Sequence, residues 1–144
     1  RRVRYSYMDC RRYANLRKMT VLGPQKIWNT KLVSIALLWV KKQNSLLIED
    51  FIDHIFVNFW KRKLDIENFD IVETIIEKCG ISQSGFKEWG KNTGKNELDA
   101  IMNEAHEKGV FGVPSYIIED ELFWGREQIP LMRAKITGNY KAII

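Results

Sequence analysis

The stretch that decides the fold lies near the C-terminus and reads Gly109-Val110-Phe111-Gly112-Val113-Pro114-Ser115-Tyr116-Ile117-Ile118. A glycine ends a helical pattern here, and a Val-Pro step then leads into a run of β-branched and aromatic residues. Proline belongs at the first residue of a strand because it cannot donate to the ladder. The Val113–Pro114 bond is also a place where a cis peptide can be held. Such a junction would leave the Val113 backbone free to pair with a ligand, and a plain strand entry is the alternative.

The residues after this stretch predict an antiparallel hairpin followed by a last helix. Two short β-branched and aromatic runs flank a two-residue turn, which is the pattern of a hairpin. The last helix tolerates Pro130 because this residue lies in its first turn. The expected elements are strands over 115–118 and 121–124, a turn at 119–120, a helix over 127–135 and a tail over 137–144.

The residues before this stretch are mostly helical in pattern. Apolar residues recur at spacings of three and four, which is typical of helices with one buried face. The segment 91–95 is expected to be a loop; it holds a Gly-Lys pair but lacks the spacing of a phosphate-binding loop. The expected elements are helices over 3–18, 31–43, 46–62, 69–79, 82–90 and 96–108, with a strand over 19–22. The fold class is therefore α/β, with a helical block between the first strand and the hairpin.

Charge is unevenly distributed along the 144 residues, whose net charge is +5. Residues 1–18 hold seven basic side chains against Asp9 alone, a local charge of +6. Such asymmetry can mark a contact with an anionic partner. Tyrosines and a methionine are interleaved with the arginines, so an amphipathic helix with solvated arginines is the expected structure, and nucleic-acid binding is not expected.

The thiols and imidazoles form no recognisable site in the sequence. Cys10 and Cys79 make no C-x-x-C motif, and His54 and His106 are not at metal-ligand spacing. A reduced, cytoplasmic setting is the expectation. The longest apolar run, 32–40, is far shorter than the roughly 20 residues that a membrane span needs, so no membrane segment is expected.

The run GVFGVPSYIIEDELFWGREQIPLM over 109–132 resembles the C-terminal signature of the DsbA-like thioredoxin superfamily. It is most similar to the 2-hydroxychromene-2-carboxylate isomerases and the kappa-class glutathione transferases. Supporting motifs are Asp9-Cys10-Arg11-Arg12-Tyr13, Gly23-Pro24 and Phe56-Val57-Asn58-Phe59-Trp60. The resemblance implies a thioredoxin-like fold with an all-helical insertion. Residues 1–30 and 109–144 would form a partial thioredoxin-like domain, and 31–108 the helical insertion domain.

The resemblance implies glutathione as cofactor. Val113, before the cis-proline Pro114, would pair its backbone with the cysteinyl part of glutathione. Arg126 and Glu127 would hold the γ-glutamyl end. The family usually has aspartate at the position of Glu127, so this residue departs from the pattern. An acid in the first turn that favours the helix dipole is the alternative role for Glu127.

Three further residues are candidates because of the same resemblance. Asn29 lies where the family places an amide near the ligand, and capping of the following helix is the alternative. Phe59 and Trp60 would form the aromatic wall for a bulky substrate, and ordinary core packing is the alternative.

The sequence offers no catalytic residue. The family begins with a strand and a turn that bears a catalytic serine, or a C-x-x-C motif in the oxidoreductases. This sequence starts after that point, and Ser6 lies too far along to stand in for the serine. The chain is therefore expected to be N-terminally truncated and inactive, lacking the first strand and the catalytic turn. Because a gap in the sheet exposes unpaired backbone, a homodimer is expected to compensate.

The function that the resemblance implies is a glutathione-dependent isomerase of the 2-hydroxychromene-2-carboxylate type. It would act on aromatic carboxylic acids or ketones, with the thiolate of glutathione as nucleophile. One alternative is a DsbA-type thiol–disulfide oxidoreductase. Another is a non-catalytic binding module that uses the basic face of residues 1–18.

Overall fold

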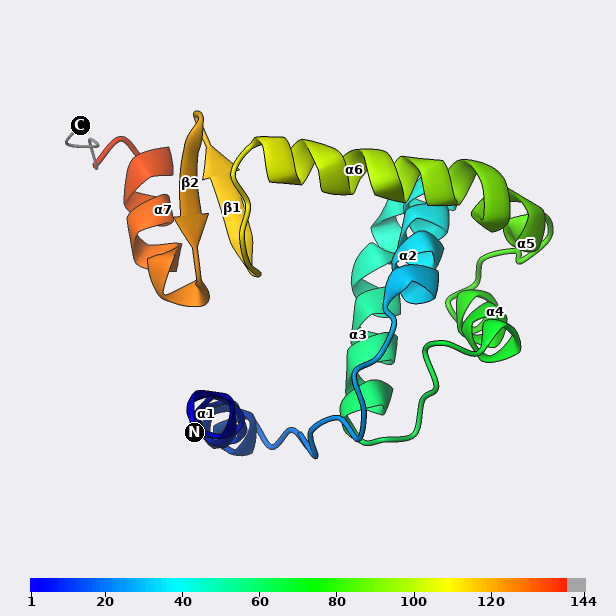
Figure 1. Cartoon of the computed structure of the whole chain (residues 1–144), viewed down its shortest axis with the longest axis horizontal. Helices are drawn as coiled ribbons and strands as arrows, with labels where there is room; N and C mark the ends of the chain where they lie inside the picture. The colour runs from blue at the N-terminus through cyan, green and yellow to red at the C-terminus, as the bar shows by residue number, and fades with distance from the viewer. Residues whose placement is uncertain (140–144) are drawn as a thin grey trace. The chain divides into compact units, whose positions relative to one another are not determined.

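The computed structural model describes residues 1–139, which form helices and one two-stranded sheet (Figure 1). The chain divides into two compact units, Arg1–Leu98 and Asp99–Ile144. The predicted grouping of 1–30 with 109–144 stays a prediction. In chain order the elements are α1 (Arg2–Leu16), α2 (Lys31–Gln43), η1 (Ser45–Leu47), α3 (Ile48–Trp60), α4 (Phe69–Lys78), α5 (Phe86–Trp89), η2 (Gly90–Gly94), α6 (Lys95–Glu107), β1 (Ser115–Ile118), β2 (Glu121–Trp124), η3 (Arg126–Gln128) and α7 (Ile129–Ile136).

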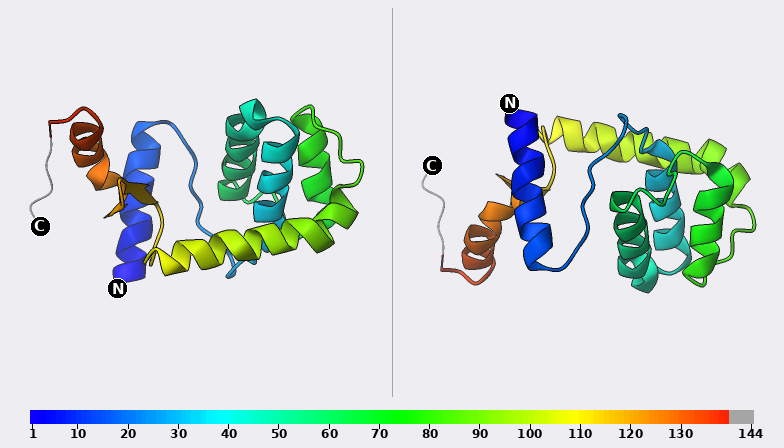
Figure 2. Two further views of the ribbon diagram at one scale, coloured as in Figure 1. Left: turned by 90° about the horizontal axis from the view of Figure 1, so that it is seen from above. Right: turned by 90° about the horizontal axis from the view of Figure 1, so that it is seen from below.

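The core of the first unit lies between α2, α3 and α4, which pack side by side (Figure 2). Each helix has apolar residues at spacings of three or four, and these residues share one face. Phe86 of α5 closes the core and is fully buried. The buried cluster consists of Ala36, Trp39, Val40, Phe51, Ile55, Ile66, Val72, Ile75, Ile76, Ile81 and Phe86.

Asparagine side chains and a glycine define the ends of these helices. The side chain of Asn44 accepts a hydrogen bond from the Leu46 N–H, and the side chain of Asn68 accepts one from Ile71. Both contacts satisfy backbone donors that a helix start leaves unpaired. Gly80 follows α4 with a φ of +78°, the left-handed position that glycine adopts most easily.

The predicted strand over 19–22 is wrong, because no strand lies there in the described chain. Two guanidinium groups hold this segment instead. Arg11 donates to the carbonyls of Val21 and Leu22, and Arg62 donates to those of Leu22 and Gly23, at 3.0–3.1 Å. The Leu22 N–H donates to the Trp60 carbonyl at 3.0 Å. The backbone groups that a ladder would use are therefore paired with side chains and with the end of α3.

The predicted loop over 91–95 is also wrong. This segment forms the π-helical turn η2 between α5 and α6, so the helical path runs from Phe86 to Glu107. A Cβ atom on Gly94 would lie 2.5 Å from the Trp89 ring and 2.9 Å from the Ile35 side chain. Glycine at this position therefore permits a close approach to α2, a packing effect that local sequence patterns do not reveal.

The second unit contains the predicted hairpin. β1 and β2 pair antiparallel, with Ser115 opposite Trp124 and Ile118 opposite Glu121. Phe123 is the buried side chain of the hairpin, and Met132 is buried on α7. Lys135 of α7 forms ion pairs with Glu121 at 2.9 Å and with Glu119 at 3.4 Å. These contacts join α7 to the hairpin.

Helix α7 ends at Ile136, as expected, and residues 140–144 of the predicted tail lie outside the described residues. None of the helices in the described part of the chain is long and apolar enough to cross a membrane.

Candidate functional site

Four of the predicted site residues lie at one end of the hairpin in the second unit. Val113 and Pro114 precede β1, and Arg126 and Glu127 follow β2. The Gly125 N–H donates to the Pro114 carbonyl at 2.9 Å, one step beyond the last pair of the ladder. The hairpin thus brings together two residue pairs that are 13 positions apart in the sequence.

The two sequence motifs at this end interlock through Gly112 and Trp124. A Cβ atom on Gly112 would lie 2.5 Å from Nε1 of the Trp124 indole, so a larger residue does not fit there. The Ser115 hydroxyl donates to the Gly112 carbonyl at 2.6 Å, which holds the turn before the strand. Phe111 lies against Trp124 with ring centroids 5.1 Å apart. These contacts explain why the Gly-Val-Pro and Phe-Trp-Gly runs occur together.

The main chain of Val113 is open at the entrance to the hairpin. Its peptide bond to Pro114 is cis, and the residue is 88% exposed. Within the described residues, neither its N–H nor its carbonyl makes a hydrogen bond. An exposed donor and acceptor on one residue can pair with the backbone of an extended peptide-like ligand.

The carboxylate of Glu127 folds back over Gly125. It lies in direct contact with the position that a Cβ atom of Gly125 would occupy, and Gly125 has a φ of +101°. The positive φ favours glycine at this position, whereas the flexible Glu127 carboxylate could move away from a Cβ atom. Arg126 is exposed beside Glu127, so one cation and one anion stand next to the Val113–Pro114 step.

The other three predicted site residues, Asn29, Phe59 and Trp60, lie in the first unit. The Oδ1 atom of Asn29 accepts a hydrogen bond from the Lys31 N–H at 3.0 Å, so the amide caps the start of α2. The capping alternative is thus observed, and a ligand contact through the remaining NH₂ group stays a prediction. Asn29 is exposed, which leaves that group accessible.

A carboxylate that the sequence did not single out holds the Asn29 segment. Glu67 accepts hydrogen bonds from the Asn29 N–H and from Lys26, both at 2.6 Å. The Lys26 hydrogen bond, followed by that of Asn29, lowers the pKa of the Glu67 carboxyl below its ordinary value. Lys26 also lies 4.2 Å from the ring centroid of Trp28, a cation–π contact. These partners are about 40 residues apart, so no local pattern could have shown the pairing.

Phe59 and Trp60 form an aromatic wall on α3. Their ring centroids are 5.1 Å apart in an edge-to-face arrangement, and Trp28 adds a second such contact to Phe59 at 5.7 Å. Both side chains are half-buried and line an apolar pocket of about 410 Å³ between α2 and α3. Thr30 and Ser34 supply its hydroxyl groups. The pocket suits a flat apolar molecule.

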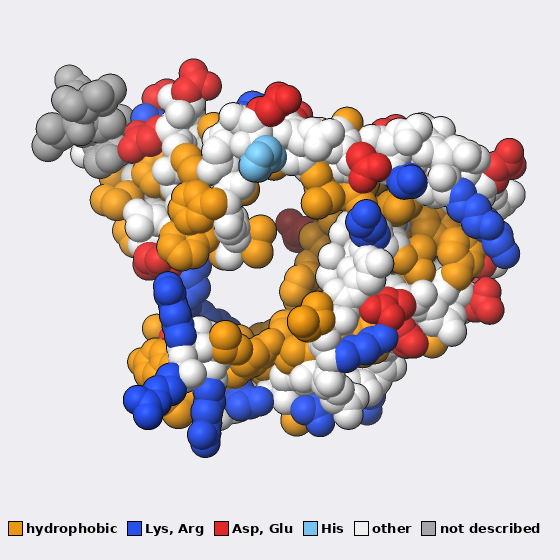
Figure 3. All heavy atoms as spheres, viewed as in Figure 1, with side chains coloured by type: hydrophobic (Ala, Val, Ile, Leu, Met, Phe, Trp, Pro, Cys, Tyr) orange, Lys and Arg blue, Asp and Glu red, His pale blue; other side chains and the backbone are white. Residues whose placement is uncertain are grey.

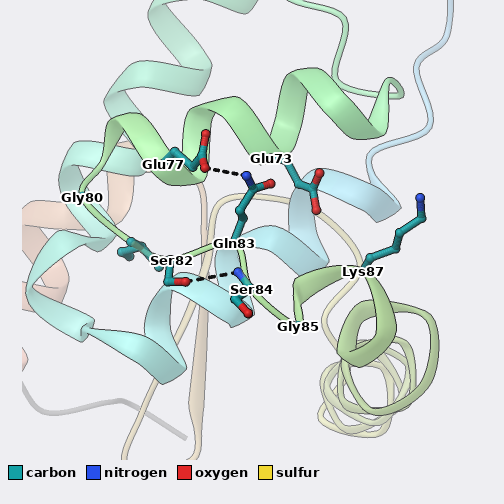
Figure 4. A pocket seen from close by; sticks show the side chains of 9 residues that line it. Glu73, Glu77, Gly80, Ser82, Gln83, Ser84, Gly85 and Lys87 are labelled. Atoms are coloured by element: carbon teal, nitrogen blue, oxygen red, sulfur yellow. Dashed lines mark hydrogen bonds between the residues drawn. The ribbon is translucent and has the colours of Figure 1, made fainter.

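A second, polar pocket of about 680 Å³ lies at the turn between α4 and α5 (Figure 4). The Gln83 amide donates to the Glu77 carboxylate, and the Ser84 N–H donates to the Ser82 hydroxyl. Glu73 and Lys87 stand at its edge (Figure 4). None of the predicted site residues lines it, and its polar groups largely bind one another.

The cysteines do not form a reactive pair. Cys10 and Cys79 are both free. Partial burial, and then the charge of Asp50, raise the pKa of the Cys79 thiol, which disfavours the reactive thiolate. No group of three or more possible metal ligands occurs among the described residues.

The basic face of α1 serves partly as a structural element. Lys and Arg side chains gather over this helix (Figure 3). Arg11 donates to the Val21 and Leu22 carbonyls, and Arg12 pairs with Asp9 at 3.5 Å. Arg17 donates to the Tyr13 carbonyl at 3.3 Å. These contacts give three of the arginines partners within the protein.

Comparison with known proteins places the chain among thioredoxin-like proteins. The model of the DSBA-like thioredoxin domain family matches residues 2–137. A 2-hydroxychromene-2-carboxylate isomerase of Pseudomonas putida is 21% identical over 131 residues, which cover 90% of this chain and 63% of that protein. The isomerase of the same name from Sphingobium xenophagum is 22% identical over 100 residues, 69% of this chain and 50% of that protein. The chain thus spans about half to two thirds of the length of these relatives.

A solved structure gives the same result for the fold. The structure of a 2-hydroxychromene-2-carboxylate isomerase superposes with a TM-score of 0.75 at 20% identity, covering 94% of this chain and 66% of that chain. The similarity confirms the predicted fold class, a thioredoxin-like fold that is rich in helices. The protein belongs to the DSBA-like thioredoxin domain family.

Proposed function

We propose that this protein is a glutathione-dependent isomerase of the 2-hydroxychromene-2-carboxylate type that acts on aromatic carboxylic acids or ketones. The family and the names of its relatives support the reaction class. The observation that carries the proposal is the end of the hairpin, where an open Val113 backbone, a guanidinium and a carboxylate lie together.

The groups at this end match the functional groups of glutathione. Glutathione is a peptide with a γ-glutamyl end that carries one ammonium and one carboxylate. The Val113 N–H and carbonyl would pair with its cysteinyl backbone, as another strand would. Glu127 would accept from the ammonium, and Arg126 would donate to the carboxylate. The extra methylene of Glu127, compared with aspartate, is accommodated because its carboxylate folds back over Gly125.

Bound glutathione would supply a thiolate nucleophile. The protein's own residues would bind and orient: Val113 fixes the cysteinyl backbone, and Glu127 fixes the γ-glutamyl end. Phe59 and Trp60 would hold the aromatic ring of the substrate against an apolar wall. None of the described residues stands where the family has its catalytic serine. Activation of the glutathione thiol is therefore not attributed to a residue of this chain.

Titration calorimetry with reduced glutathione tests the proposal. The 144-residue chain is expected to bind, and Val113→Pro and Glu127→Ala are expected to weaken binding by about tenfold each, which corresponds to about 1.4 kcal/mol. Glu107→Ala removes an exposed carboxylate on α6 and serves as the control, with unchanged affinity. Equal binding by all four proteins would show that the site is misplaced.

The alternative of a thiol–disulfide oxidoreductase has less support from this chain. The Phe123-Trp124-Gly125 run, followed by the acid Glu127, favours the isomerase type. The residue in the family's catalytic turn decides between the two: a serine supports the isomerase and a C-x-x-C motif the oxidoreductase. The cytoplasmic setting stays a prediction. So does the homodimer, which β1 favours because one of its edges has no partner strand in the described chain; light scattering decides between monomer and dimer.

A further inference from the structure

A third pocket lies on the other side of α2 from the Phe59–Trp60 wall. Leu32 and Ile35 of α2 line this pocket, whereas Val33 and Leu37 line the aromatic one. Its volume is about 500 Å³, which is within the range of small-molecule sites. Of the residues predicted for the isomerase function, Asn29 lines this pocket, whereas Val113, Pro114, Arg126, Glu127, Phe59 and Trp60 do not.

The floor of this pocket is apolar and flat. Phe69 and Phe86 stack with ring centroids 5.3 Å apart and planes 18° apart. Phe86 is fully buried and belongs to the core, so the floor is held rigidly by the surrounding helices. Phe86 supports Phe69 from behind, and a flat apolar group would contact the half-buried Phe69, Leu32 and Ile35.

The rim of the pocket carries an excess of positive charge. Lys31, Lys91 and Lys95 line it, and no ion pair to any of the three is formed among the described residues. Glu67 is the acid in the lining, and both of its oxygens are already engaged, one by Lys26 and one by the Asn29 N–H. Three unpaired cations at one rim attract an anion of more than one charge.

The π-helical turn η2 brings two of these lysines to the rim. Lys91 lies within the turn and Lys95 directly after it, where its N–H donates to the Gly90 carbonyl. Gly90 and Gly94 permit the close packing of this turn on Ile35, which forms part of the same pocket. Single π-helical turns inside α-helices are rare and occur frequently at functional sites.

We propose that this pocket binds a small organic dianion with a flat apolar group, such as an aryl phosphate or an aromatic dicarboxylate. The ring would lie against the half-buried Phe69, Leu32 and Ile35, and the two negative charges would face Lys31, Lys91 and Lys95. Lysine binds phosphate as a point charge, so both kinds of anion satisfy the same rim. The proposal does not depend on glutathione or on the hairpin.

A series of naphthalene ligands tests this inference by calorimetry on the 144-residue chain. The expected order of affinity is 1-naphthyl phosphate and naphthalene-1,4-dicarboxylate first, then 1-naphthoate, then 2-naphthol. Inorganic phosphate alone is expected to bind more weakly than the naphthyl phosphate by at least tenfold. The ratio of the affinities for the two dianions tells whether the site favours a phosphate or a pair of carboxylates. Affinity for the dianions is expected to fall as salt rises.

Lysine variants locate the site. Lys91→Ala with Lys95→Ala is expected to weaken naphthyl phosphate binding by about tenfold or more, while the 2-naphthol affinity stays the same. The matched control removes Lys41 and Lys78, two exposed lysines outside the pocket, and is expected to leave both affinities unchanged. Both double variants are measured only if their circular dichroism spectra match that of the parent protein. Equal loss in the control, or equal affinity for dianion and 2-naphthol, would overturn the proposal.

Discussion

The two units of the chain are held together by different means. The first unit buries eleven apolar residues in one cluster between its helices. In the second unit, Phe123 and Met132 are the buried apolar side chains among the described residues. The hairpin ladder and the Lys135 ion pairs supply its other contacts. The exposed Val113 backbone and Glu127 belong to this lightly packed unit. The difference indicates that stability comes from the helical core, whereas the candidate ligand groups are positioned by backbone pairing.

The largest effect is expected from Phe86→Ala in the helical core. Phe86 is fully buried and contacts both Phe69 and Trp39, so its removal leaves a cavity. The free energy of unfolding is expected to fall by about 3–5 kcal/mol. Phe111→Ala, at a 71% exposed aromatic of the second unit, is the control and is expected to cost less than about 1 kcal/mol. Similar losses for the two variants in urea unfolding would contradict the conclusion that stability comes from the helical core.

An intermediate effect is expected from Gly94→Ala in η2. The new Cβ atom would lie 2.5 Å from the Trp89 ring, which a well-packed helix interface cannot accommodate without movement. A loss of about 1–3 kcal/mol is expected. At Gly90 the nearest atom would be 3.3 Å away, so Gly90→Ala is expected to cost clearly less. If both variants unfold at the same urea concentration, the close packing of η2 on α2 is not what stabilises this turn.

A smaller effect is expected from Arg62→Met, which keeps the aliphatic stem and removes the guanidinium. Its two hydrogen bonds to the Leu22 and Gly23 carbonyls would be lost. Because water can replace part of these contacts, a loss of about 1 kcal/mol is expected. Lys63→Met is the control, because it removes a neighbouring exposed cation without such contacts. A neutral Arg62→Met variant would mean that other contacts hold the 21–23 segment.

The smallest effect is expected from the acid titration of Glu67. Its pKa is lowered in the folded protein, so the carboxylate contributes stability above its unfolded pKa. That contribution is lost as the pH falls through the folded pKa. Carboxyl NMR titration is expected to give a Glu67 midpoint below the ordinary glutamate value. In Glu67→Gln, the unfolding free energy should depend less on pH in the acid range; an unchanged pH dependence would contradict this account.

Much of the fold could be predicted from the sequence because its signals are local. Helical spacing predicts the core face of α3, and the helix starts depend on asparagines whose side chains cap them locally, Asn44 and Asn68. The hairpin was evident from its strand and turn residues. The errors have a common cause, since both depend on contacts between distant residues. Arg62 holds the segment predicted as a strand, and Gly94 packs on Ile35 in the segment predicted as a loop.

The candidate site shows the same division. Val113 and Glu127 follow from motifs beside the hairpin, whose geometry is short-range. The partnership of Asn29 with Glu67, and the meeting of Lys31 with Lys91 and Lys95, join residues far apart in the sequence. Local sequence patterns do not predict such long-range contacts, because these depend on how the helices pack.

The most direct test of the central claim is the change in backbone amide NMR shifts of the 144-residue chain on titration with reduced glutathione. The proposed site predicts the largest changes at Val113, Gly125 and Glu127, with saturation at a common affinity. The helical core around Phe86 should show little change. Saturable shifts confined to the core helices, or no shifts at the hairpin end at millimolar glutathione, would contradict the assignment of this site.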